Sequence, residues 1–229
     1  GASSGTVQPV TTRVELGDIL DSSGGQSNQR AIYVGTGRYL GDGAYLANPE
    51  DSDILNTDMQ SFYAIRDDAD NLKNWGNFRS QAGVKKFSIS GSGNSRKVSY
   101  EAVLASGPGW YMDFDSPSGE RVVINPRLFN GEQKTLTVVS STPSSNNMCK
   151  VGGTSYVYML ETQPTNTHDS LNAVFPITQA IAVGAAGISL PGGKLAVIVN
   201  LSDGKTVTVS PSTSPGSKIK RGLWRELVN

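Results

Sequence analysis

His168 is the only imidazole in this 229-residue chain, so it is the only histidine that could serve as a catalytic base. A nucleophile such as Cys149, the single cysteine, would need that base within hydrogen-bond reach, and no local signature places the two together. Gly91-Ser92-Gly93 lies in a polar stretch without the strand–turn–helix setting of a G-x-S-x-G nucleophile elbow. We therefore interpret His168 as a solvated loop residue and predict no catalytic residue.

Motifs that would bind a cofactor are incomplete in the same way. Gly35-Thr36-Gly37 begins a G-x-G-x-x-G motif, but Leu40 stands where the third glycine of a dinucleotide site belongs. No Walker sequence occurs, and one cysteine with one histidine cannot build a closed structural zinc site. The sequence therefore predicts no cofactor-binding residue.

Calcium is the metal that the acidic residues could bind, because hard cations take clustered carboxylate and carbonyl oxygens. The acidic clusters are Glu50-Asp51-Ser52-Asp53 with Asn56 and Asp58, then Asp67-Asp68-Ala69-Asp70-Asn71, and Asp113-Phe114-Asp115. None matches the EF-hand loop, and in the first cluster Leu55 occupies the fifth position, where an oxygen ligand belongs. We favour solvated turn carboxylates and assign no metal ligand, with Asp51, Asp53 and Asp58 as the alternative calcium site.

Charge and hydropathy exclude two classes of partner. The chain has 20 basic and 20 acidic residues, and only 17% of its residues are charged. Nucleic acids and anionic membranes attract proteins through a basic excess or patch, so neither is an expected partner. No run of 18 apolar residues occurs, which predicts no transmembrane helix. The low charge and the many Gly, Ser, Thr and Asn residues suit an exported protein, in which Cys149 has no internal disulfide partner.

The sequence predicts mostly strands around these candidate residues. Short β-rich runs end in glycine or aspartate turns and predict strands at 30–34, 61–66, 155–161 and 195–201, the last returning through a hairpin to 206–210. We also expect a hairpin of 122–125 with 135–139, one or two helical turns at 68–75, long loops at 41–59 and 139–153, and a linker at 211–218 before a closing strand at 221–228. Trp75, Trp110, Tyr111 and Trp224 are expected to pack between strands. The pattern predicts one all-β domain over 1–229, with a flexible N-terminal end at 1–7.

Several blocks occur in an order that resembles a known family. They are Gln8-Pro9-Val10-Thr11-Thr12, Tyr33 to Leu40, Gln60 to Asp67, Gly109 to Phe114, Gly119-Glu120-Arg121-Val122-Val123, Cys149 with Gly152-Gly153-Thr154-Ser155, and Gly222 to Leu227. Together they resemble the C-terminal half of the β-propeller domain of PilY-family type IV pilus tip and biogenesis proteins, a group that includes adhesins. Any single block would be weak, and their shared order over most of the chain makes the resemblance specific.

The resemblance implies a partial or small quinoprotein-like β-propeller with long loops. It implies a non-enzymatic extracellular protein at the pilus tip or outer cell surface, supporting pilus biogenesis, adhesion and motility. Its partners would be minor pilins or other pilus subunits and a host or abiotic surface. The loops 41–59 and 143–153 would make contact, with Tyr39, Tyr45 and Trp110 as anchors, although core packing is the favoured use of these aromatics.

Two departures from the family pattern set further expectations. A propeller blade takes about 40 to 50 residues, so 229 residues supply four or five blades at most. We therefore expect a fragment, a truncated homologue or one half of an assembly, and in the last case the missing N-terminal propeller part would be a separate chain. The stretch from Gln163 to Asp169, where family members often carry a calcium-type loop, has too few carboxylates to bind calcium. Two other functions remain open: a quinone-dependent or hydrolytic propeller enzyme, and a structural filament subunit.

Overall fold

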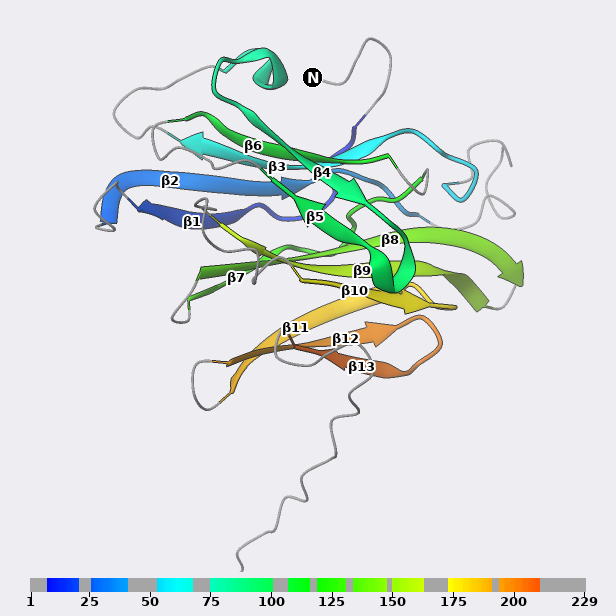
Figure 1. Ribbon diagram of the computed structural model, residues 1–229. Helices are drawn as coiled ribbons and strands as arrows, with labels where there is room; N and C mark the ends of the chain where they lie inside the picture. Colours follow the sequence, from blue (N-terminus) through cyan, green and yellow to red (C-terminus); the bar gives the residue numbers. More distant parts are fainter. Residues whose placement is uncertain are drawn as a thin grey trace, which may run out of the picture.

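Strands form most of the described chain and are arranged as three open sheets (Figure 1). In this computed structural model, the described residues are 8–20, 26–40, 53–67, 75–100, 107–115, 119–130, 134–147, 150–162, 173–190 and 194–210. The strands are β1 (Glu15–Leu20), β2 (Gln26–Gly35), β3 (Gln60–Asp67), β4 (Lys85–Ser90), β5 (Lys97–Ser99), β6 (Gly109–Phe114), β7 (Arg127–Asn130), β8 (Lys134–Asn147), β9 (Lys150–Glu161), β10 (Ala173–Thr178), β11 (Ala182–Leu190), β12 (Lys194–Leu201) and β13 (Thr206–Val209), with short 3-10 turns η3 (Phe78–Ser80) and η4 (Gly93–Ser95). The prediction of an all-β fold is confirmed, and no sheet in this part of the chain closes on itself.

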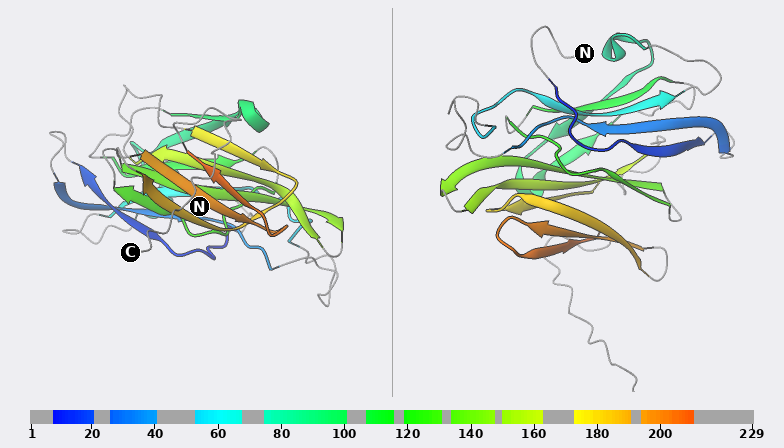
Figure 2. Two further views of the ribbon diagram at one scale, coloured as in Figure 1. Left: turned by 90° about the horizontal axis from the view of Figure 1, so that it is seen from below. Right: turned by 180° about the vertical axis from the view of Figure 1, so that it is seen from behind.

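The three sheets stack as layers, which is clearest when the molecule is seen from behind (Figure 2). The first sheet has the order β1-β2-β3-β6-β4-β5, the central sheet β10-β9-β8-β7, and the third sheet β11-β12-β13. Paired strands are antiparallel, except that β4 runs parallel to β6. In the central and third sheets each strand pairs only with its neighbours along the chain, so both are simple meanders.

The central sheet is buried on both faces because successive residues of a strand point to opposite sides. Val138 and Tyr158 belong to the core between the first and central sheets, whereas Val139 and Val157 belong to the core between the central and third sheets. All four side chains are between 0% and 3% exposed. Tyr156 and Tyr158 share one face, as their spacing predicts. A sheet covered on both sides explains why β8 and β9 contain apolar residues at both odd and even positions.

The β4–β5 ribbon crosses from the first sheet to the central sheet (Figure 1). β4 pairs with β6 through Lys85 to Phe87 and with β5 through Ser88 to Ser90. Arg96 fixes the far end of this ribbon, because its Nε donates to Tyr158 Oη at 2.8 Å and its guanidinium lies 4.1 Å from the Tyr156 ring centroid. The ribbon therefore ties two layers together through side chains rather than through strand pairing.

Most expected strands are confirmed, including the β12–β13 hairpin with Val197 opposite Val209. The hairpin arm expected at 122–125 is wrong: β7 begins at Arg127, five positions beyond the expected start. The segment before it is a crossing between layers, in which Val122 is 0% exposed and donates its backbone N–H to Thr36 O. Burial of Val122 in this crossing, and not strand pairing, accounts for its apolar character.

The long loop expected at 139–153, with its contact segment 143–153, is also wrong. β8 continues to Asn147 and pairs with β9 through Pro143 opposite Gly153 and Ser144 opposite Gly152. The Ser, Thr, Pro and Asn residues that indicated a loop belong to the second half of β8. β7 pairs only with residues 134–137 of β8, so it does not cover this half of the strand. A proline is tolerated there because the strand has an open edge.

Several predicted features lie outside the described residues. They are the N-terminal end 1–7, residues 68–74 of the expected helical turns, Cys149, His168, the stretch 163–169, the linker 211–218 and the expected closing strand 221–228. Among the residues that the structure describes, no helix has both the length and the apolar character needed to cross a membrane.

Candidate functional site

Five of the seven blocks that carry the resemblance meet in one hydrogen-bonded network at the first sheet. Gln8, from the first block, donates through Nε2 to Met59 O (2.9 Å) and to Ser61 Oγ (2.9 Å). Tyr63 Oη donates back to Gln8 Oε1 at 2.7 Å. One glutamine therefore binds both the segment leading into β3 and the strand itself, more than 50 positions away along the chain.

The β2 terminus adds two further blocks to this network. Thr36 N donates to Ser61 O, and Ser61 N donates to Thr36 Oγ1, both at 2.8 Å. Thr36 O in turn accepts from Val122 N at 3.0 Å. Gly37 N donates to Pro9 O at 2.8 Å, so this segment is also bonded to the first block, residues 8–12. These bonds fix Thr36 and Gly37 against β3 and against the blocks at 8–12 and 119–123.

Asp113 on β6 is the acidic centre of the network. Arg79 donates through Nη2 to Asp113 Oδ1 (2.7 Å) and through Nη1 to Oδ2 (3.1 Å), and Ser61 Oγ donates to Oδ1 at 2.7 Å. Lys86 Nζ lies 3.2 Å from Oδ2, and the Arg79 guanidinium lies 4.5 Å from the Tyr111 ring centroid. Asp113 is thus a buried carboxylate paired by two cations.

These contacts change the protonation equilibria of both partners. Burial alone would raise the pKa of the Asp113 carboxyl, but the hydrogen bonds from Ser61 and Arg79 and the nearby charge hold it below its ordinary value. Burial would lower the pKa of Arg79, and the bonds to Asp113 and Tyr63 outweigh that effect and raise it. Both shifts favour the charged pair, so the pair is ionised at neutral pH.

Arg121 is the second basic centre, and it is 3% exposed. Its Nε donates to Gly119 O (2.8 Å), its Nη1 to Arg38 O (3.0 Å) and Asp53 O (2.6 Å), and its Nη2 to Asn56 O (2.6 Å). One guanidinium therefore holds the turn that precedes it and two distant loop segments. Burial lowers the pKa of Arg121, but an arginine remains protonated in proteins.

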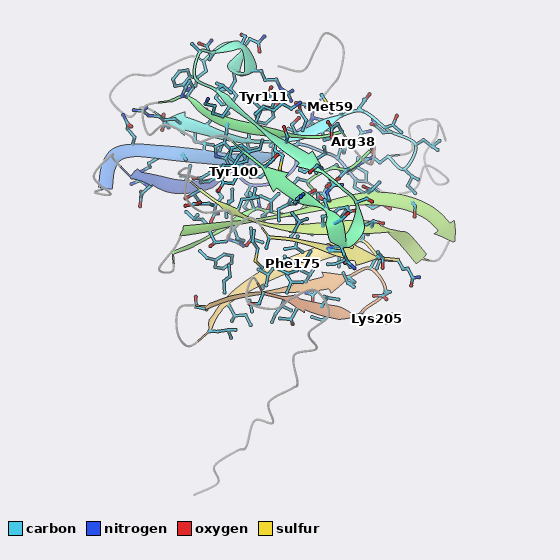
Figure 3. All side chains as sticks on the ribbon, in the orientation of Figure 1. Arg38, Met59, Tyr100, Tyr111, Phe175 and Lys205 are labelled. Carbon is cyan, nitrogen blue, oxygen red and sulfur yellow. The ribbon has the colours of Figure 1, made fainter. Side chains whose placement is uncertain are left out.

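A polar cavity of about 310 Å³ lies beside this centre. Its lining consists of Pro9, Arg38, Asp53, Asn56, Asp58, Gln60 and Arg121. Figure 3 labels Arg38 and Met59 on the same side of the molecule, in agreement with the bonds that join their segments. The cavity presents guanidinium, carboxamide and carboxylate groups together, which equips it to bind a small polar ligand by hydrogen bonds.

The alternative calcium site is only partly described. Asp51 lies outside the described residues, whereas Asp53 and Asp58 both line the cavity. Asp53 Oδ1 accepts from Arg38 Nε at 2.9 Å and Oδ2 accepts from Leu40 N. No group of three or more His, Cys, Asp or Glu side chains placed to hold a metal ion occurs within the described part of the chain.

The aromatic candidates are used in different ways. Trp110 is 1% exposed and stacks on Phe87 with ring centroids 4.1 Å apart, so the expected core packing is confirmed and Trp110 is not a surface anchor. Trp75 donates its indole N–H to Arg66 O at 2.9 Å. Tyr39 is half-buried, and Tyr45 and Trp224 lie outside the described residues.

The sequence did not single out a third polar centre, the ion pair of Arg96 with Glu120. Both side chains are 0% exposed. Glu120 also accepts from Ser140 Oγ and from Tyr158 Oη, the latter at 2.7 Å. Burial raises the pKa of the Glu120 carboxyl, against the attraction of Arg96. The only sequence signal for a buried charge here was the adjacent Glu120 and Arg121, which stand between a glycine and two valines. In a single sequence, two adjacent charges of this kind look the same as those of a solvated turn.

Comparisons of this chain with protein-family models, curated proteins and solved structures found no match.

Proposed function

We propose that this chain is a non-enzymatic extracellular module of a type IV pilus machine, placed at the pilus tip, where it supports pilus biogenesis and adhesion. The proposal starts from the resemblance to the PilY family and assigns the stacked sheets to successive blades of a partial β-propeller. The central and third sheets are meanders packed face to face, and this supports the assignment for these two sheets, since propeller blades have this organisation. The six-stranded first sheet, with β4 parallel to β6, departs from the blade pattern.

The observation that carries the proposal is the convergence of the resembling blocks. Residues of the blocks at 8–12, 33–40, 60–67, 109–114 and 119–123 are hydrogen-bonded to one another through side chains and backbone. The block at 152–155 lies on β9 of the central sheet, and the block at 222–227 lies outside the described residues. The assembly of the five blocks into one network supports the interpretation that they form a single structural unit.

A partner chain belongs to the same proposal. Minor pilins or other pilus subunits would contact this module, and a further propeller part on a separate chain would pack on its open sheets. Open sheets carry strand edges with unpaired backbone groups, and such edges accept added strands.

Deletion of the gene, followed by electron-microscopic counting of surface pili, tests the biogenesis claim. We expect a marked loss of surface pili that is restored by the complementing gene. The same sheared pilus fraction should contain this protein together with minor pilins on immunoblots. Unchanged pilus number in the deletion strain, with the protein absent from sheared pili, would overturn the proposal.

A further inference from the structure

We propose that the polar cavity defined by Arg38, Asn56, Asp58 and their neighbours binds a neutral saccharide ring. This inference deepens the adhesive part of the proposed function, on which it rests for its biological setting. Its chemical basis is separate, because it depends only on the groups that line the cavity and on their existing partners.

The polar groups on the floor of the cavity are already hydrogen-bonded before any ligand enters. The guanidinium of Arg121 donates to four backbone carbonyl oxygens. The two carboxylate oxygens of Asp53 accept from Arg38 Nε and from Leu40 N. Asp53 is 2% exposed and Arg121 is 3% exposed, so both are held by the fold. A floor fixed in this way needs no rearrangement on binding, which lowers the cost of ordering the site.

The rim of the cavity, formed by Arg38, Asn56 and Asp58, provides hydrogen-bond donors and acceptors close to one another. The Arg38 side chain is 46% exposed while its Nε is fixed on Asp53, so its terminal amino groups remain accessible. The exposed Asp58 is held by Asn56, because Asp58 N donates to Asn56 Oδ1 at 2.8 Å and Asn56 Nδ2 donates to Asp58 Oδ2 at 3.4 Å. Each sugar hydroxyl both donates and accepts, so adjacent hydroxyls match a guanidinium beside a carboxylate and a carboxamide.

The volume of the cavity and the charges of its lining residues determine which small polar ligands fit it. A volume of about 310 Å³ lies at the lower end of the roughly 300–1,000 Å³ range of ligand pockets, which suits one sugar ring rather than an extended chain. Two guanidinium groups and two carboxylates line the cavity, so neither a small anion nor a divalent cation meets a lining of the opposite charge alone. A neutral polyol avoids both repulsions and uses both kinds of group.

Saturation-transfer-difference NMR on the purified chain tests the inference directly. The probes are D-glucose, D-galactose, D-mannose, N-acetylglucosamine and N-acetylgalactosamine, with calcium chloride and sodium phosphate titrated separately by calorimetry. We expect transfer to at least one of the sugars and no heat from either salt. Asp58→Ala should weaken binding of that sugar at least about tenfold, equivalent to about 1.4 kcal/mol. Asp58→Asn, which keeps one acceptor oxygen, should weaken it less.

Asp203→Ala is the matched control, because Asp203 is an acidic turn residue on the third sheet whose carboxylate pairs with Lys205 at 2.7 Å. Its sugar binding should equal that of the parent chain. Absence of transfer to every sugar, binding of a salt alone, or full binding by Asp58→Ala would each overturn the saccharide site. None of these outcomes bears on whether the gene is needed for pili, so the two proposals fail separately.

Discussion

Arg121 Nη1 donates to the backbone oxygen of Asp53 at 2.6 Å, although the two residues are 68 positions apart. The Asp53 carboxylate binds Arg38 and the backbone N–H of Leu40, so the contact closes a set of bonds that joins three segments around the cavity. Arg121 therefore has a structural role in building the floor of the cavity, and we expect the exposed groups of the rim to contact a ligand.

Arg121→Ala should lower the free energy of unfolding by about 3 kcal/mol or more, because four backbone carbonyls lose their donor in a buried setting. Arg121→Lys should recover only part of the loss, since one ammonium cannot span four acceptors. Arg127→Ala, at an exposed position, is the control and should change stability by less than about 0.5 kcal/mol. Urea denaturation measures all three, and equal stability of Arg121→Ala and Arg127→Ala would contradict the role of Arg121.

Glu120→Gln should destabilise the chain by about 3 kcal/mol, because it leaves the buried Arg96 without its counter-charge. Replacing both partners, as in Arg96→Met with Glu120→Gln, should cost less than the sum of the two single changes, since no uncompensated charge remains. A double-mutant cycle by chemical denaturation gives the coupling energy. Additive single effects, within about 0.5 kcal/mol, would show that the pair is not coupled.

The lowered pKa of Asp113 makes the free energy of unfolding depend on pH in the acid range. Because its folded-state pKa is lowered, its contribution is present above the unfolded pKa of about 3.9 and is lost as pH falls through the folded-state value. Asp113→Asn should therefore be much less stable than the parent at pH 6, and the difference should shrink towards pH 2. Asp115→Asn, at an exposed position, should follow the parent curve. A constant difference for Asp113→Asn across this range would refute the assignment.

Packing of the third sheet on the central sheet requires a glycine at position 187 of β11, where there is no room for a side chain. A methyl group there would overlap the Phe129 ring, whereas at Gly184 on the same strand the nearest atom, Asn200 Nδ2, is 3.8 Å away. Gly187→Ala should cost about 1–3 kcal/mol through overpacking, and Gly184→Ala should cost much less. Thermal denaturation compares the pair. Equal melting temperatures would mean that Phe129 moves aside freely.

The sequence predicted the strands whose apolar pattern is local, such as β3, β9 and the β12–β13 hairpin. It failed where tertiary position overrides composition: β8 extends through polar residues to Asn147, and Val122 is buried without being in a strand. The charge pair of Arg96 with Glu120 forms where two distant segments meet, and the adjacent charges at 120–121 do not show in one sequence that Arg96 lies beside them. The cavity was foreseen only through Asp53 and Asp58, and its arginines became evident from contacts over long chain separations.

Immunogold labelling of intact cells with an antibody against this chain tests the proposed placement at the pilus tip. We expect gold particles at the distal ends of pili, absent in the gene-deletion strain and restored on complementation. Labelling distributed along pilus shafts would indicate a filament subunit, and labelling that never coincides with pili would contradict placement in the pilus machine.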